Sequence, residues 1–423
     1  MLDFSVRRRA RSATVVAAVG GVALAGTALL APNASSAAVA GDCASPYPVE
    51  SLAAGQAVTG KTVSKGTTPE GFTGEVLGVI DDGIAVDQDM VVMRLTSPEI
   101  DRVGGIWSGM SGSPVYAEDG RLIGAVAYGL AWGPSPVAGV TPFEDMDDYL
   151  APGTARRVRV STTQARRIAA RTEVTREQAA QGFARLRMPL TVKGVAPARL
   201  KAVDQRFYRT RSLESGQAGG RSDASAADIV AGGNLAATLS YGDITAGGVG
   251  TVTSVCNDRV VGFGHPLTFA GRTSLGLHPA SAVYVQEDSL GAPFKVANFG
   301  APVGTIDQDR GSGITGSLGA APRATALSSQ VSFGERTRTG TTDVYLRDFS
   351  AEASLAQILA NQDRVLDAVT AGGAEQTWTI TGTGPDGAAF TLNDGDRYAS
   401  SYDISAETPL DVADTVWALT SIR

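Results

Sequence analysis

The sequence predicts a mainly β protein in which two β modules are joined by a helical linker and followed by a smaller α+β module. Short apolar runs cut by Gly, Asp and Pro recur through residues 44–150 and again through 229–325, as is typical of strands. Residues 151–228 change to helical spacing with many arginines. Residues 326–423 combine strands with one well-formed helix. A chain of 423 residues is long enough for these separate units to have their own cores.

The first module contains a hairpin directly after a serine-rich turn. Its expected strands are Gly74–Asp81, Met90–Leu95, Ser113–Tyr116 and Leu122–Tyr128. Glu118-Asp119-Gly120 supplies the turn between the last two. Ser111 therefore lies on a loop that enters a strand.

The sequence of the linker, residues 151–228, predicts an exposed helix and then a loop. Thr162–Arg187 carries apolar residues at helical spacing and ends at Met188-Pro189. Its arginines leave polyanion binding open, although a solvated helix face is the simpler interpretation in a chain of net charge -7. Residues 212–228 are rich in Gly, Ser and charge, and predict a mobile surface loop and a site of proteolytic nicking.

The second module and the C-terminal module follow. Strands are expected at Gly248–Val255, Arg259–Phe263 and Ala282–Gln286. The helix of the C-terminal module is expected at Ala351–Val369, with Ser350 as N-cap and Gly372 beyond its end. Residues 393–396 predict a tight turn, with a calcium loop as the lesser alternative.

Composition excludes several classes of function. The net charge of -7 provides no basic field for a nucleic-acid backbone, so no nucleic-acid partner is expected. With two cysteines and two histidines, a structural zinc site is not expected either, and the sequence predicts no metal and no cofactor.

The N-terminus predicts export. Arginines near the start precede an apolar run from about Ala13 to Ala31 and the small-residue stretch Ala38-Val39-Ala40, which together are typical of a cleaved signal peptide over residues 1–40. An uncleaved membrane anchor is the alternative, and it would be the chain's one membrane attachment. The mature protein is expected to be secreted or to lie at the cell surface.

Cys43 and Cys256 predict one disulfide in an exported chain. Two unpaired thiols are the alternative.

Ser111, in Gly109-Met110-Ser111-Gly112-Ser113-Pro114, is the candidate nucleophile. Flanking glycines let the chain turn sharply and present consecutive N–H groups, so the amides of Gly109 and Ser111 are the candidate oxyanion hole. Ser113 is the competitor, but Pro114 removes a donor where an oxyanion amide is needed.

His265 is the candidate general base. It lies in Gly264-His265-Pro266 at the exit of a strand, whereas His278, in Leu277-His278-Pro279, has less local framing. A Ser-Lys pair is the distant alternative.

These segments resemble the SpoIVB-type serine peptidases, the sporulation stage IV protein B family. The resemblance is carried by three stretches: Gly109–Pro114 with Gly120–Val126, Phe263-Gly264-His265, and Gly304-Thr305-Ile306 with Gly313–Gly316. It implies a trypsin-like double β-barrel, a Ser111–His265 catalytic pair, and an exported peptidase that cuts itself or a partner protein. In trypsin-like peptidases the second strand after the nucleophile lines the specificity pocket, and Leu122–Gly129 matches that strand.

The chain departs from the family in two respects. The serine segment precedes the histidine segment here, whereas the family has the reverse order, and a triad is defined by geometry rather than by order. No aspartate stands at the family's place upstream of the serine, where Thr96 lies instead. Four acids remain candidates for the third member: Asp101, Asp243, Asp258 and Asp309.

The sequence thus predicts a serine endopeptidase that acts on a protein or peptide, including itself. The alternative is a catalytically inactive surface protein that keeps the barrels for binding or assembly. A Ser111–His265 separation well beyond about 4 Å would favour the alternative.

Overall fold

The computed structural model describes residues 41–131, 133–147, 157–186, 191–203, 218–289 and 292–422. The expected signal peptide, residues 1–40, lies outside these residues, as does part of the expected loop at 212–228. Within the described residues, no helix is both long and apolar enough to cross a membrane.

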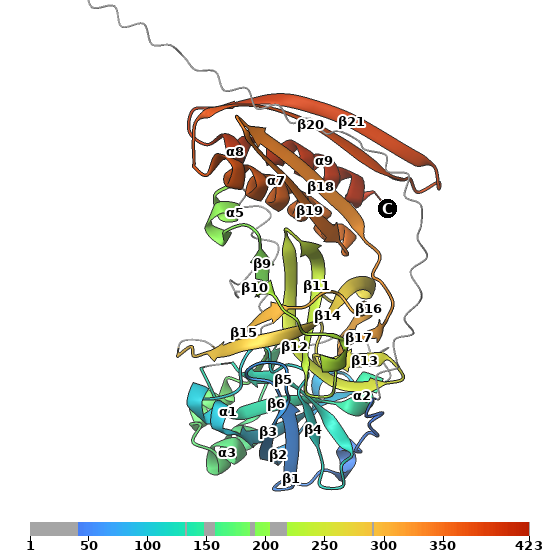
Figure 1. The fold of residues 1–423 in the computed structure, drawn as a ribbon. Helices are drawn as coiled ribbons and strands as arrows, with labels where there is room; N and C mark the ends of the chain where they lie inside the picture. Colours follow the sequence, from blue (N-terminus) through green and yellow to red (C-terminus); the bar gives the residue numbers. More distant parts are fainter. Residues whose placement is uncertain are drawn as a thin grey trace, which may run out of the picture.

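The fold is built on two closed six-stranded antiparallel barrels, which confirms the expected trypsin-like double barrel (Figure 1). In the first barrel the strand order is β4-β1-β2-β3-β6-β5, and pairing of β4 with β5 closes it. Its strands are β1 (Ala57–Thr62), β2 (Glu70–Ala85), β3 (Gln88–Thr96), β4 (Pro114–Tyr116), β5 (Leu122–Leu130) and β6 (Val137–Pro142).

Side-chain alternation fills this barrel. In β1 exposed and buried residues alternate strictly, so one face supplies Val58 to a core shared with Met93, Val126 and Val140. β5 is buried along nearly its whole length because both of its faces are covered. Three short helical segments flank the barrel: η1 (Val49–Ser51), α1 (Pro98–Val103) and α2 (Phe143–Asp147).

The second barrel has the order β14-β16-β17-β13-β12-β11 and closes through β14 and β11. Its strands are β11 (Asn234–Gly242), β12 (Thr245–Cys256), β13 (Arg259–Gly262), β14 (Gly271–Gln286), β16 (Gly304–Arg310) and β17 (Gly313–Leu318). The sheet continues beyond the barrel through β15 (Phe294–Phe299), β10 (Ala218–Arg221) and β9 (Thr191–Lys193). A short 3₁₀ segment, η2 (Ala226–Asp228), precedes β11.

The linker differs from the single helix expected at Thr162–Arg187. It forms β7 (Arg157–Val158), α3 (Thr162–Arg171), α4 (Arg176–Ala180), β8 (Phe183–Arg185) and, after a gap, α5 (Pro197–Val203). The helix stops because Thr172 is extended, and Thr175 starts a new helix by capping the amide of Gln178. Gly182, at φ +79°, then turns the chain into β8, which pairs with β5.

The C-terminal part comprises β18 (Thr325–Phe333), β19 (Arg336–Val344), η3 (Arg347–Phe349), α7 (Ser350–Leu366), β20 (Gly372–Thr383), β21 (Ala389–Ser400), α8 (Ile404–Glu407) and α9 (Pro409–Ser421). β19 pairs with β11, so this part extends the sheet of the second barrel. The helix begins at Ser350 rather than after it, because η3 leads directly into α7. Residues 393–396 lie inside β21, not in a turn; the chain reverses at Gly384–Ala388 instead.

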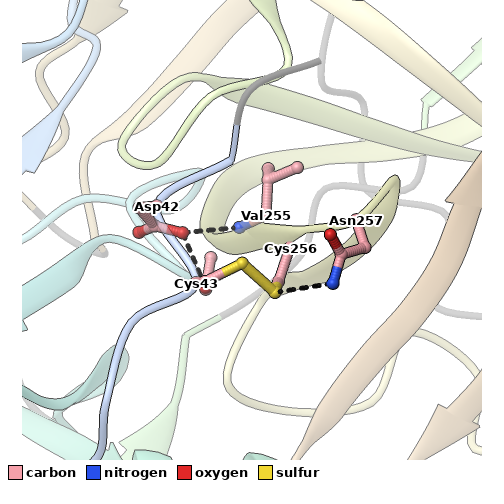
Figure 2. Close-up of a disulfide and its surroundings, with 6 residues drawn as sticks. Asp42, Cys43, Val255, Cys256 and Asn257 are labelled. Atoms are coloured by element: carbon pink, nitrogen blue, oxygen red, sulfur yellow. Dashed lines mark hydrogen bonds between the residues drawn. A yellow bond between two sulfur atoms is a disulfide. The ribbon is translucent and has the colours of Figure 1, made fainter. Parts of the chain in front are cut away.

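The segment around Cys43 ties the two barrels together (Figure 2). The Cys43–Cys256 disulfide is present, and it joins positions 213 residues apart. The Asp42 carboxylate accepts hydrogen bonds from Ser254 Oγ at 2.8 Å and Val255 N at 2.9 Å, at the end of β12. A few residues later Tyr47 N donates to Leu122 O of β5. One short stretch is therefore bound to both barrels.

Candidate active site

Ser111 lies on a tight loop directly before β4. Gly109 and Gly112 adopt φ +98° and +97°, a region that favours glycine. A Cβ on Gly112 would stand 2.0 Å from Thr251 O, so only glycine allows the loop to approach β12 this closely. Gly112 N donates to Val126 O at 2.8 Å, which fixes the loop to β5.

His265 follows β13 in the second barrel and meets Ser111 across the interface. Its Nε2 lies 2.9 Å from Ser111 Oγ, and its Nδ1 lies 2.9 Å from the carbonyl oxygen of Pro266. A carbonyl can only accept, so Nδ1 carries the proton and Nε2 is free to accept the serine proton. The sequence-predicted pair is thus brought together well within the 4 Å that separates the two hypotheses.

The backbone before His265 is strained in a manner common at functional sites. Phe263 has φ +72°, an unusual value for a bulky residue, and Gly264 follows at φ +68°. Thr141 Oγ1, from the first barrel, donates to Gly264 O at 2.6 Å and secures this turn.

Both members of the pair are fully buried, at 0% exposure. Burial and, secondarily, the positive charge of Arg185 lower the pKa of His265 to about 3. The imidazole is therefore neutral at neutral pH, the form in which it can act as a base.

The two amides expected to form the oxyanion hole, those of Gly109 and Ser111, donate no hydrogen bond to the described residues. Around the serine, Met110 N donates to Trp107 O at 3.0 Å and Ser113 N to Met110 O at 3.0 Å. The N–H groups of Gly109 and Ser111 donate to no hydrogen bond within the part of the chain that the structure describes. Two unpaired amides in the loop that carries the nucleophile are suited to receive the charge of a carbonyl under attack.

Asp309 is the candidate acid that reaches the histidine's own segment. Its fully buried carboxylate accepts hydrogen bonds from Leu267 N at 2.8 Å, Thr268 N at 2.7 Å and Ala270 N at 3.2 Å, as well as from Thr268 Oγ1 at 2.8 Å. These contacts hold the loop after Pro266 rather than the imidazole ring. The ring nitrogen that an acid would bind is instead engaged by Pro266 O.

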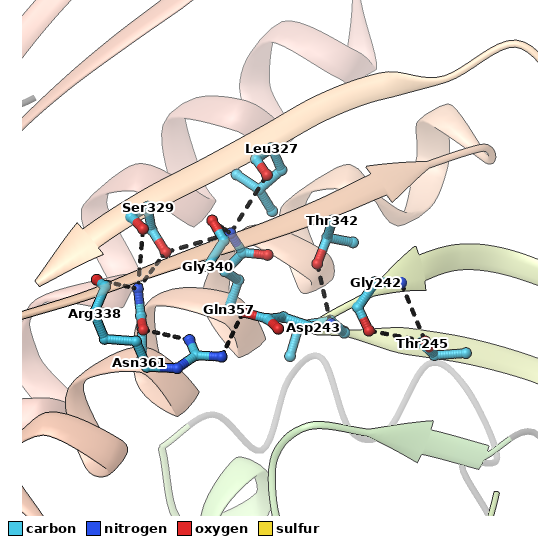
Figure 3. Close-up of polar contacts among 11 residues, drawn as sticks. Gly242, Asp243, Thr245, Leu327, Ser329, Arg338, Gly340, Thr342, Gln357 and Asn361 are labelled. Atoms are coloured by element: carbon cyan, nitrogen blue, oxygen red, sulfur yellow. Dashed lines mark hydrogen bonds and ion pairs between the residues drawn. The ribbon is translucent and has the colours of Figure 1, made fainter. Parts of the chain in front are cut away.

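The other three acids lie elsewhere. Asp101 is on α1, where it accepts from Thr96 Oγ1 at 3.4 Å. Asp243 forms an ion pair with Arg338 at 2.7 Å, in a polar cluster that joins the β11–β12 turn to β19 and α7 (Figure 3). Asp258 lies in the turn between β12 and β13, where its carbonyl accepts from Leu318 N.

Threonines of β12 support the nucleophile loop, and sequence reasoning missed them. Thr251 N donates to Ser111 O at 2.8 Å, Thr251 Oγ1 to Gly109 O at 3.2 Å, and Thr253 Oγ1 to Gly112 O at 2.8 Å. The alternation of Thr251 and Thr253 was the available signal, since both point to one face of a strand. The hydroxyl of Ser113, the competing serine, donates a buried hydrogen bond to Thr62 Oγ1 at 2.9 Å, so this side chain holds β4 against β1.

The comparisons with known proteins bear on the serine half of this site. Residues 44–141 match the family model described as SpoIVB peptidase S55, and the match ends before His265. No curated protein and no solved structure matches the chain. The matched segment runs from Ala44, directly after the disulfide cysteine Cys43, into β6 and contains the whole Ser111 loop. Over residues 44–141, the chain is thus similar to the SpoIVB peptidase S55 family, the serine peptidases to which its sequence motifs pointed.

Proposed function

We propose that this protein is an exported serine endopeptidase that uses Ser111 as nucleophile and His265 as general base. The observation that carries the proposal is the 2.9 Å contact between Ser111 Oγ and His265 Nε2, beside two unpaired amides. The family match over residues 44–141 supports the chemistry.

In the proposed reaction, Ser111 Oγ attacks the carbonyl carbon of a peptide bond while His265 Nε2 takes its proton. The amides of Gly109 and Ser111 receive the negative charge on the carbonyl oxygen. His265 then gives the proton to the leaving amine, and water hydrolyses the acyl-enzyme. Pro266 O holds the tautomer, a role that an aspartate has in a complete triad, so we expect slower turnover than a triad provides.

Export, processing and substrate complete the proposal. A cleaved signal peptide over residues 1–40 would deliver the chain to an oxidising compartment, which agrees with the Cys43–Cys256 disulfide. We propose a protein or peptide substrate, with the chain itself among its targets.

The test is labelling by a fluorophosphonate probe, which reacts with activated serines. We expect purified protein to be labelled at Ser111, and Ser111→Ala to be unlabelled. Ser113→Ala is the matched control, because that serine lies two residues away in a structural contact. A folded protein that stays unlabelled even after prolonged incubation, while a control hydrolase reacts, would overturn the proposal.

The alternative is an inactive surface protein on the same scaffold, and one observation favours it: both Ser111 and His265 are fully buried. It predicts that Ser111→Ala leaves every binding property intact and that the wild-type chain shows no labelling.

A further inference from the structure

The edge of β5 beside the nucleophile is covered by a strand that is not part of the barrel. β4 pairs with β5 only as far as Ala125, and Ala127–Leu130 extend past it. β8 pairs antiparallel with this extension, with Arg185 opposite Tyr128 and Ala184 opposite Gly129. An open strand edge is a template on which an extended peptide can pair, so β8 occupies a peptide-binding position.

Leu186, which follows β8, is anchored within one residue of the nucleophile loop. Gly112 N donates to Val126 O, and Leu186 N donates to Ala127 O at 3.0 Å. Gly264, next to His265, also packs against Ala127, since a Cβ at Gly264 would stand 3.0 Å from that of Ala127. Leu186 thus lies against a residue that contacts both halves of the site.

The side chain of Leu186 lies among the buried apolar residues around the nucleophile loop. Leu186 is buried at 4% exposure in the apolar cluster that includes Trp107, Met110 and Val126, on the side of the Ser111 loop. Its Cδ2 would lie 3.0 Å from a Cβ at Gly129, so the absence of a side chain there makes room for it. Arg185, on the opposite face of the strand, is near enough to His265 for its charge to lower the pKa of the imidazole.

The carbonyl of Leu186 does not engage the catalytic donors. It accepts no hydrogen bond from the amides of Gly109 or Ser111, which stay unpaired among the described residues. A scissile carbonyl has to reach those donors to react. β8 therefore has the position of a substrate without its reactive geometry, which is the arrangement of an inhibitor.

We propose that Phe183–Leu186 is a built-in inhibitor of the peptidase, that Leu186 fills the pocket for the residue on the acyl side of the cleaved bond, and that substrates carry an aliphatic residue there. The inference rests on the proposed function. It offers an explanation for the full burial of Ser111 and His265, because β8 pairs with the edge of β5 that continues from the nucleophile loop.

The experiment compares the rate of fluorophosphonate labelling at Ser111 in wild type and in Leu186→Asp, whose charge cannot stay in an apolar pocket. We expect Leu186→Asp to react at least about tenfold faster, because Phe183–Leu186 no longer blocks the probe from reaching Ser111. Leu186→Met keeps the pocket filled and should react like wild type. Leu359 is a buried leucine of α7 in a different apolar cluster from Leu186, so Leu359→Ala controls for general loosening of the core.

If Leu186→Asp does not fold, Leu186→Ala carries the same test, with a melting temperature recorded for each variant. Equal labelling rates for wild type and a folded Leu186→Asp or Leu186→Ala variant would overturn the inference while leaving the proposed function intact. Absence of labelling in every variant would instead refute the proposed function.

Specificity is tested on Leu186→Asp with quenched peptides that differ only at the acyl-side residue. We expect a peptide with Leu at that position to be cleaved at least about tenfold more efficiently than one with Lys. A synthetic peptide of residues 182–186 should inhibit this variant, and the same peptide ending in Asp should not. No preference for Leu, or equal inhibition by both peptides, would contradict the assignment of the pocket.

Discussion

The chain contains two buried hydroxyl–imidazole pairs, and their difference shows what makes one of them reactive. His265 lies between Ser111 Oγ and a carbonyl, and His278 lies between Thr238 Oγ1 at 2.8 Å and the carbonyl of Gly300 at 3.0 Å. Burial lowers the pKa of both rings, to about 3 for His265 and about 4 for His278. The local hydrogen bonds are therefore nearly the same.

The surroundings of the two hydroxyls are not the same. Thr238 is in the middle of β11, with Gly247 of β12 opposite it on one side and Gly276 of β14 on the other. Its backbone is thus committed to the barrel, and no peptide carbonyl can approach. Ser111 lies on a glycine loop with two unpaired amides, at the end of a strand edge that a peptide can join. A hydroxyl–histidine contact is common chemistry, whereas free donors and a peptide-binding edge are what favour catalysis.

The largest expected effect separates the two histidines. His265→Gln should lower peptide hydrolysis by the Leu186→Asp variant about 10²- to 10⁴-fold, because the general base is lost. His278→Gln in the same background should keep activity within a few-fold, with a lower melting temperature since a buried contact is changed. Steady-state kinetics and calorimetry measure both. Equal losses in the two variants would mean that the pairs do not differ as described.

The second prediction concerns the contact between barrels, on which only the Ser111 pair depends. Replacing both cysteines of the Cys43–Cys256 disulfide by Ser should reduce the free energy of unfolding by about 2–5 kcal/mol, since the bond closes a loop of 213 residues. Denaturant titration measures the loss, and wild type under reducing conditions should match the variant. A change below about 0.5 kcal/mol would show that the Asp42 contacts suffice.

Asp309 has a smaller expected effect, through the position of His265. Asp309→Asn weakens hydrogen bonds to the loop after Pro266, so kcat should fall about tenfold while KM changes little. Asp307→Asn is the matched control, because its ion pair with Arg259 is about half exposed and contributes little. A fall in stability with unchanged kcat would make Asp309 structural only.

The smallest expected effect comes from Lys295, whose side chain runs past Gly109 and whose Nζ donates to Asn234 Oδ1 at 2.8 Å. Burial lowers its pKa to about 7 from 10.5. Between these values the unfolded chain binds a proton that the folded chain does not, so this residue makes stability rise with pH from about 7 to 10. Below pH 7 both states are protonated and the gain is absent.

Lys295→Met should remove this pH dependence. Denaturant unfolding at pH 6, 7.5 and 9 should show wild type gaining stability relative to the variant as pH rises. A difference that stays constant over that range would show that Lys295 is charged in the folded protein.

Local patterns determined much of this protein. Short apolar runs cut by Gly, Asp and Pro predicted more than half of the barrel strands, the glycines around Ser111 predicted the turn, and the scarcity of histidines left His265 as the best base. Each of these depends on neighbours in the chain, so it can be read without the fold. The Cys43–Cys256 pairing was predictable for the same reason, because two cysteines allow one disulfide.

Only the tertiary structure decided the rest. Phe183–Leu186 read as the end of a helix, because its spacing is compatible with one; β8 forms there because the open edge of β5 offers hydrogen bonds that an isolated helix end does not. Likewise, the sequence did not distinguish among the four candidate acids. In the folded protein the Asp309 carboxylate accepts from loop amides such as Leu267 N, and the His265 imidazole bonds to the carbonyl of Pro266 instead of to an acid. Such choices depend on partners distant in the chain, which folding alone brings into contact.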